Sequence, residues 1–178
     1  MEIGKDEVMT VRWIGAILIV AGCGGVGFGM ALHYKREEST LRQLLKILEM
    51  FCCELEYRMT PLPELFMKAG QTAAGPLSKL FSIAFERLQM QCAPDASQCL
   101  NDALRCCKDL PVSVTFALTD LAGTLGEYDL NGQLKGIYSV QGTCRRQLAE
   151  LENNRTQRIR SYQTLGLCAG AALAIIFI

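Results

Sequence analysis

The stretch LRQLLKILEMFCCELEYRM, residues 41–59, decides the fold of this chain. Its apolar residues recur at steps of three and four with charged residues between them, a pattern typical of a helix that buries one face. No proline or glycine occurs between Ala31 and Thr60, so we expect this helix to begin well upstream of residue 41. The residues expected in its core face are Leu41, Leu44, Leu45, Leu48, Phe51, Cys52, Leu55 and Met59.

Upstream of this helix, residues 13–32 (WIGAILIVAGCGGVGFGMAL) carry no charged side chain. As a helix they would be about 30 Å long, the thickness of the hydrocarbon core of a bilayer. A second uncharged run, residues 164–178, closes the chain and is shorter. The sequence therefore predicts a hydrophilic leader (1–12), a transmembrane helix (13–32), a single domain (33–163) and a short transmembrane helix (164–178).

The basic residues predict the orientation of these spans, because cytoplasmic flanks of membrane helices are enriched in Lys and Arg. Both inner flanks are basic, which predicts a cytoplasmic middle domain with both termini across the membrane. A cleaved signal peptide is the alternative for residues 13–32, but the leader is acidic and the cations follow the apolar run, the reverse of a secretory signal. The flanking cations are Lys35, Arg36, Arg155, Arg158 and Arg160.

Small residues recur at every fourth position in both apolar runs, a spacing that lets helix backbones approach closely in lipid. Packing of the two spans within one molecule and packing against another copy or another subunit both fit this pattern. The small residues are Ala21, Gly25 and Gly29 in the first run and Gly166, Gly170 and Ala174 in the second.

The middle domain is predicted to be helical throughout, so the fold class is all-α, with prolines and glycines between the helices. Thr60 is expected to cap a short helix that ends at Met67, and a loop from Gly70 to Gly75 follows. Later helices are expected from Pro76, over residues 96–108 and 112–125, and from residue 130 onward, with Asp129 as the cap of the last. Phe116 is expected in the core, and Tyr138 on the apolar side of the last helix. The long first and last helices are expected to form an antiparallel stalk that continues into the membrane.

Composition and spacing give little sign of catalysis or cofactor binding. The formal net charge is zero, which gives no reason to expect nucleic acid as a partner. The nine cysteines form no C-x-x-C pair and the single histidine is His33, so neither a zinc site nor a nucleophilic dyad is expected. We expect no enzyme, no cofactor and no small-molecule substrate. A membrane-anchored thiol-redox or metal sensor is the alternative function.

Several segments together resemble a known family, the stage III sporulation protein AB family. They are Glu54-Leu-Glu-Tyr57, Thr60-Pro-Leu-Pro-Glu-Leu65, Leu125-Gly-Glu-Tyr-Asp129 with Gln133, and Leu165-Gly-Leu before the apolar end. The resemblance extends from Val11 to the end of the chain. The leader of residues 1–10 and the many cysteines depart from the family pattern.

The resemblance implies a role in endospore formation, within a complex that spans the envelope between mother cell and forespore. Family members look like the inner-membrane platform protein of type II secretion and type IV pilus machines. It also implies a scaffold in the outer forespore membrane that contacts an ATPase, the stage III sporulation protein AA, and the other membrane proteins of the complex. The residues expected to contact partners, at the distal end of the stalk, are Thr60, Pro61, Leu62, Glu64, Gly126, Asp129 and Gln133.

Overall fold

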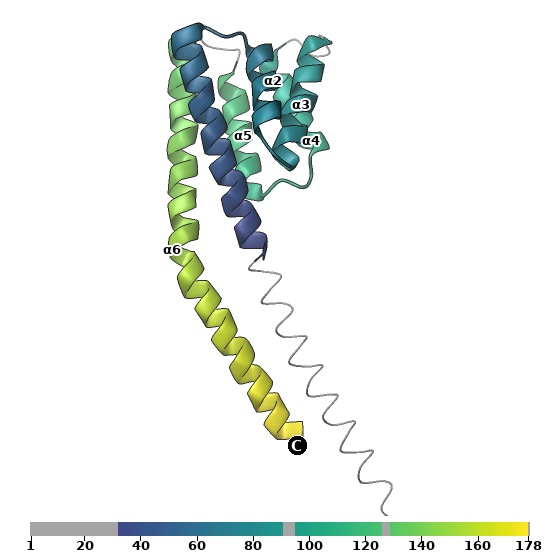
Figure 1. Cartoon of the computed structure of the whole chain (residues 1–178), viewed down its shortest axis with the longest axis vertical. Helices are drawn as coiled ribbons and strands as arrows, with labels where there is room; N and C mark the ends of the chain where they lie inside the picture. The colour runs from purple at the N-terminus through teal and green to yellow at the C-terminus, as the bar shows by residue number, and fades with distance from the viewer. Residues whose placement is uncertain (1–31, 91–94, 126–128, 178) are drawn as a thin grey trace, which may run out of the picture. The chain divides into compact units, whose positions relative to one another are not determined.

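The structure, a computed structural model, describes residues 32–90, 95–125 and 129–177, with side chains described up to Asn153. Residues 32–58 are helical and are called the first helix below. The helices that follow are α2 (Leu62–Thr72), α3 (Pro76–Gln89), α4 (Ala96–Cys106), α5 (Val112–Thr124) and α6 (Leu130–Phe177) (Figure 1). Every element in the described ranges is helical, and the all-α class is confirmed. Residues Arg36–Glu150 form one compact unit, and the packing below is that of this unit.

The core of this unit is built from one apolar stripe on each helix. The stripe predicted for the first helix is buried from Leu41 to Leu55, and only Met59, 74% exposed, departs from it. Three phenylalanines from the first helix, α2 and α3 meet at the centre. The ring centroids of Phe51, Phe66 and Phe81 lie 6.0 to 6.3 Å apart. Such tilted and edge-on contacts are favourable for aromatic rings, so this cluster joins the three helices.

The first helix lies antiparallel to the beginning of α6. Gln141 Nε2 donates to Cys52 Sγ at 3.6 Å, and Arg145 forms an ion pair with Glu49 at 3.2 Å, so later residues of one helix face earlier residues of the other. This pairing concerns residues 36–150. The stalk and its continuation into membrane segments stay predictions.

Helix α5 runs parallel to the first helix. Its first turn lies beside Glu37 of that helix. Ser113 Oγ, in the first turn of α5, donates to Glu37 Oε1 at 2.5 Å. At its other end, Thr124 lies against Gly136 of α6: a Cβ added to Gly136 would fall 2.5 Å from the Thr124 Cβ. Helix α5 is therefore held by the first helix at one end and by α6 at the other.

The predicted loop from Gly70 to Gly75 begins later than expected. Helix α2 continues to Thr72, and Gly70 is a buried helical residue. The absence of a side chain lets α3 pack closely here, where Ser78 Oγ donates to the Gly70 carbonyl oxygen at 2.7 Å. The turn comes at Gly75, whose φ of 63° lies in the left-handed region, and Pro76 begins α3 as predicted.

The prediction that Phe116 belongs to the core is wrong, since its side chain is 65% exposed. Residues two apart on a helix point in nearly opposite directions, so burial of Val114 and Leu118 turns Phe116 outward. Tyr138 is likewise half-exposed, at 51%, because α6 buries Ile137 and Val140 instead.

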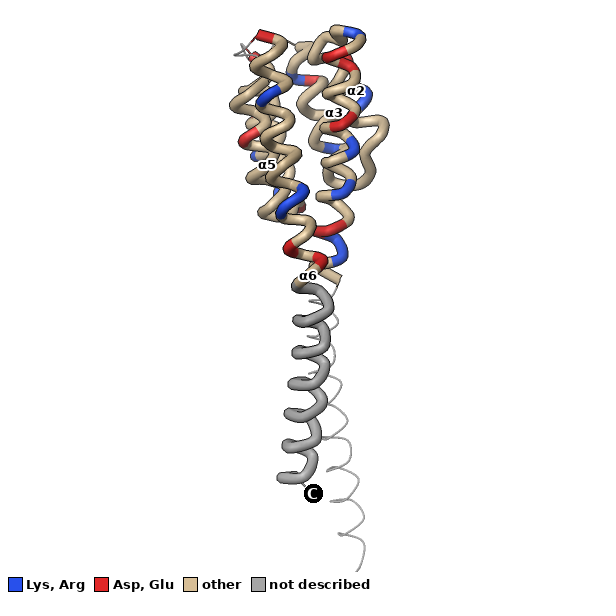
Figure 2. Tube along the Cα trace, turned by 90° about the vertical axis from the view of Figure 1, so that its left-hand side faces the viewer, with Lys and Arg blue, Asp and Glu red and all other residues tan. Residues whose placement is uncertain are grey.

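Charged residues of both signs are interspersed along the helices of residues 36–150 (Figure 2). Several are paired, as in Arg87 with Asp102 at 2.8 Å and Arg42 with Glu38 at 3.0 Å. This arrangement is that of a solvated helical surface, in agreement with the neutral composition.

Candidate functional site

The first helix ends in a turn that contains most of the residues predicted to contact partners. Its last helical residue is Arg58, and Met59 takes a left-handed φ of 49°, a conformation that usually belongs to glycine. The Thr60 N–H then donates back to the Glu54 carbonyl oxygen at 3.2 Å. The chain thereby leaves the first helix and enters α2, with Pro61 at the N-cap position.

The expected role of Thr60 as the side-chain cap of α2 is wrong. Its hydroxyl donates to Glu54 Oε2 at 2.6 Å, and α2 has no side-chain cap. The left-handed Met59 turns Thr60 toward the first helix, where it is 7% exposed. Thr60 therefore closes the first helix, and Glu64 stands in the first turn of α2 as expected, a favourable place for an acid.

Glu54 is the centre of the polar contacts at this turn. Lys68 Nζ donates to Glu54 Oε2 at 2.9 Å and also pairs with Glu64 at 3.2 Å, and Arg58 lies 3.3 Å from Glu54 Oε1. The hydrogen bonds from Lys68 and then Thr60 lower the pKa of the Glu54 carboxyl, and the bond to Glu54 raises the pKa of Lys68. One carboxylate thus ties together the first helix, the turn and α2.

The predicted cap of the last helix is confirmed. Asp129 Oδ1 accepts the Gly132 N–H at 3.0 Å, which satisfies one of the unpaired donors at the start of α6. The Gln133 N–H bonds the Asp129 carbonyl oxygen at 3.0 Å. Gly126 lies outside the described residues.

The turn after the first helix and the start of α6 lie at the same end of residues 36–150. The antiparallel register is fixed by two contacts, Glu49 with Arg145 and Cys52 with Gln141. When this register is continued along both helices, Met59 comes level with about residue 134. Figure 1 shows both segments at this end. The two groups of predicted contact residues are thus brought together, with Pro61, Glu64 and Asp129 exposed, Leu62 and Gln133 half-buried, and Thr60 buried.

Three exposed side chains with large apolar parts stand beside these residues and were not singled out as contact residues from the sequence. Tyr57 is 79% exposed, Met59 74% and Tyr138 51%. Tyr138 hydrogen-bonds the Cys52 thiol from α6, which keeps its ring beside the first helix. In the sequence Tyr57 stands between the charged residues Glu56 and Arg58. An aromatic residue between two charges was the signal from which its exposure could have been predicted. We call Tyr57, Met59, Pro61, Glu64 and Asp129 the distal surface.

The residues predicted to pack within a membrane lie where the structure describes no side chains. Ala21, Gly25 and Gly29 lie outside the described residues, and Gly166, Gly170 and Ala174 fall in α6 beyond the described side chains. In the described ranges no helix combines the length and the apolar character that crossing a membrane requires.

The cysteines with described side chains are free thiols. Burial raises the pKa of Cys52 and Cys107, and it raises that of Cys144 to about 11. Cys53 and Cys106 are exposed. Within residues 32–90, 95–125 and 129–153, whose side chains are described, no group of three metal-binding side chains occurs.

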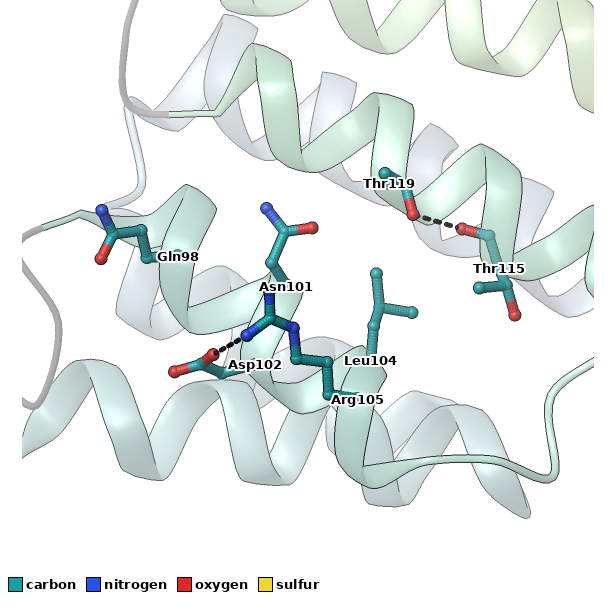
Figure 3. A pocket seen from close by; sticks show the side chains of 7 residues that line it. All are labelled: Gln98, Asn101, Asp102, Leu104, Arg105, Thr115 and Thr119. Carbon is teal, nitrogen blue, oxygen red and sulfur yellow. Dashed lines mark hydrogen bonds and ion pairs between the residues drawn. The ribbon is translucent and has the colours of Figure 1, made fainter.

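A cavity of about 600 Å³ lies between α4 and α5 (Figure 3). Asp102 at its edge is paired with Arg87 and lies 4.0 Å from Arg105, and Thr119 Oγ1 donates to the Thr115 carbonyl oxygen. Among its lining residues no base stands beside a nucleophile. The lining residues are Gln98, Asn101, Asp102, Leu104, Arg105, Thr115 and Thr119.

Comparison with known proteins agrees with the family resemblance. The family model of stage III sporulation protein AB matches residues 12–178. The stage III sporulation protein AB of Bacillus subtilis (strain 168) is 27% identical over 169 residues, which cover 93% of this chain and 98% of that protein. A solved structure of stage III sporulation protein AB (SpoIIIAB) is similar with a TM-score of 0.62 and 25% identity, over 68% of this chain and 98% of that one.

Proposed function

This chain belongs to the stage III sporulation protein AB family, and from that premise we propose that it is a non-enzymatic membrane platform of the sporulation complex. It would link a cytoplasmic ATPase, the stage III sporulation protein AA, to the other membrane proteins of that complex during endospore formation. The observation that carries this proposal is the distal surface, where two chain segments far apart in the sequence lie at the same end of the domain and expose apolar and acidic side chains.

The distal surface has the features of a protein-binding site. Tyr57 and Met59 expose large side chains, and aromatic residues and methionine are enriched at interfaces. The acidic groups of Glu64 and Asp129 stand beside them at helix starts. Glu54 ties the turn to α2, so the backbone that carries Met59 is held in place before a partner binds, which favours affinity.

The membrane part of the proposal rests on the sequence. Residues 13–32 and 164–178 would span the membrane, with the domain of residues 33–163 in the mother-cell cytoplasm and both termini across the outer forespore membrane. The small residues Gly25 and Gly29, with their counterparts in the second span, would pack the spans against each other or against other subunits.

Co-purification in detergent from sporulating cells tests the proposal. The wild-type chain is expected to recover the ATPase, and the double variant Tyr57→Ala with Met59→Ala is expected to lose it while keeping its helical fold. The matched control is Phe116→Ala, which removes a side chain 65% exposed near the start of α5, at the other end of the domain, and should leave recovery unchanged.

Asp129 needs a variant that separates its charge from its role as a cap. Asn caps a helix about as well as Asp, so Asp129→Asn keeps α6 intact while it removes the carboxylate. Loss of ATPase recovery in this variant would assign the carboxylate to the interface. Recovery of the ATPase by every distal-surface variant would contradict the proposal.

The alternative of a thiol-redox sensor receives no support from the buried cysteines. A sensor needs a thiol with a lowered pKa and access to oxidant. Cys52, Cys107 and Cys144 are buried with raised pKa values, the opposite condition.

A further inference from the structure

Two tyrosines from distant parts of the chain are exposed at the seam between the first helix and α6. Tyr57 is 79% exposed and Tyr138 51%. These helices lie side by side and antiparallel over this part of the domain (Figure 1). Their register brings residue 56 level with about residue 138, so Tyr138 stands across the seam from the last turn of the first helix.

The contacts of Tyr138 show which side chains lie next to it. Its hydroxyl hydrogen-bonds the Cys52 thiol, which holds the ring at the seam. Charge on Cys52, and after it on Glu56 and Tyr57, raises the pKa of the Tyr138 hydroxyl, an effect that requires these groups to lie close to it. The carboxylate of Glu56 and the two tyrosine rings therefore form one group, which we call the seam cluster.

The seam cluster contains an acid that no described cation neutralises. Glu56 is exposed, and within the ranges whose side chains are described no Lys or Arg forms an ion pair with it. Arg58 and Arg145, on the two helices of the seam, are each engaged by another glutamate, at 3.3 and 3.2 Å. A negative charge therefore stands beside two aromatic rings at the surface, with no counter-charge from the described part of the domain.

This combination of groups favours a positively charged ligand. The face of a tyrosine ring is negative, and a Lys or Arg side chain placed over it is attracted. A carboxylate beside the rings adds a full negative charge, and a guanidinium group can both stack on a ring and bond a carboxylate. Tyrosine and arginine are also the residues that most often dominate binding at protein interfaces.

We propose that the seam cluster receives a cationic side chain, arginine or lysine, from the ATPase, with the rings of Tyr57 and Tyr138 against the cation and Glu56 as its counter-charge. The inference rests on the proposed function and names the chemistry of the partner at this face. Glu64 and Asp129 of the distal surface have the same sign as Glu56, so the ATPase face that covers them is expected to be basic.

The first experiment measures the Kd of the purified ATPase for the full-length chain in lipid nanodiscs by biolayer interferometry. Tyr57→Phe is followed by phenylalanine analogues with one, two or three ring fluorines at position 57. Fluorine withdraws negative charge from the ring face with little change in shape, so each fluorine should weaken binding, by roughly 3- to 30-fold over the series. The matched control is the same series at Phe116, 65% exposed near the start of α5, where the Kd should not change.

The second experiment tests the carboxylate. Glu56→Gln is expected to weaken binding by about 3- to 10-fold at low salt, mainly through slower association, and to reduce the salt dependence of the Kd. Its control is Asp109→Asn, an exposed acid in the segment before α5, which should leave the Kd and its salt dependence unchanged.

The outcomes separate this inference from the proposed function. If the wild-type chain binds the ATPase but fluorination at position 57 has no more effect than at position 116, the inference is overturned and the proposed function stands. A loss of binding with Tyr57→Phe that fluorine does not deepen would assign a hydrogen bond of the hydroxyl in place of a cation contact, which also overturns it. If the wild-type chain does not bind the ATPase, both fail.

Discussion

Gly136 of α6 lies so close to Thr124 of α5 that a Cβ on the glycine would meet both the Cβ and the Cγ2 of the threonine at 2.5 Å. This contact packs the end of α5 against α6, close to the start of α6. It explains a glycine at a helical position where alanine would otherwise be preferred.

Gly136→Ala is expected to destabilise the domain, because the clash moves helix backbone and not the end of a flexible side chain. The expected loss in the free energy of unfolding is about 1 to 3 kcal/mol, the usual range for overpacking. The control is Gly142→Ala in the same helix, where a Cβ meets nothing within 4 Å and a gain of about 0.5 to 1 kcal/mol is expected. Urea unfolding followed by circular dichroism measures both. Equal effects at the two glycines would contradict the close contact.

Met59→Gly is expected to stabilise the domain by about 1 kcal/mol, because a left-handed backbone strains every residue with a Cβ and glycine adopts it freely. The side chain of Met59 is 74% exposed, so little packing is lost. Met90→Gly is the control, since Met90 is similarly exposed but has an ordinary φ of −76°, and it should stabilise nothing. The same urea titrations provide the measurement, and a loss of stability with Met59→Gly would show that its side chain contributes more than the strain costs.

Glu54→Gln is expected to lower the urea midpoint at neutral pH and to change its dependence on acid. The folded state holds the pKa of Glu54 below its ordinary value of 4.5, so its contribution is complete above that value and is lost as the pH falls through the lowered pKa. The difference in urea midpoint between wild type and Glu54→Gln should therefore become smaller below pH 4.5. Glu64→Gln is the control, because Glu64 also pairs with Lys68 but is more exposed than Glu54. It should lower the urea midpoint by less. A gap that does not change with pH would argue against the ionic role of Glu54.

Alkylation of the folded protein is expected to be slow at the buried cysteines and fast at the exposed ones. With a pKa of about 11, only about one Cys144 thiol in a thousand is ionised at pH 8, so its alkylation should be at least about 100-fold slower than that of the exposed Cys53. Iodoacetamide labelling followed by peptide mass spectrometry compares the sites, and denaturant should remove the difference. Rapid labelling of Cys144 in the folded chain would revive the sensor hypothesis.

Much of the fold could be predicted because helix periodicity and proline positions are local signals. The buried stripe of the first helix, the start of α3 at Pro76 and the Asp129 cap all depend on residues within a few positions of one another, and all are confirmed. The family resemblance, carried by the turn sequences after the first helix and before α6, is confirmed as well.

What could not be predicted depends on contacts between distant residues or on uncommon backbone conformations. The left-handed Met59 redirected Thr60 from α2 to Glu54, although threonine before a proline-rich helix start is an ordinary cap signal. Phe116 is the largest apolar residue in α5, but the direction of the buried face was decided by smaller neighbours. The juxtaposition of Gly136 and Thr124 leaves no local trace in the sequence.

The pairing of the first helix with α6 has a consequence for how this domain forms during synthesis. Glu49 and Arg145 are almost a hundred residues apart, so the partner of the first helix is the last part of the domain to leave the ribosome. Until then α6 does not bury the side of the first helix that includes Cys52. Apolar surface exposed in this way during synthesis is prone to aggregation. The closing contact is also the one with the greatest sequence separation, which makes it slow to form. Synthesis of the first part of α6, through Arg145, is therefore the step on which closure of this core depends.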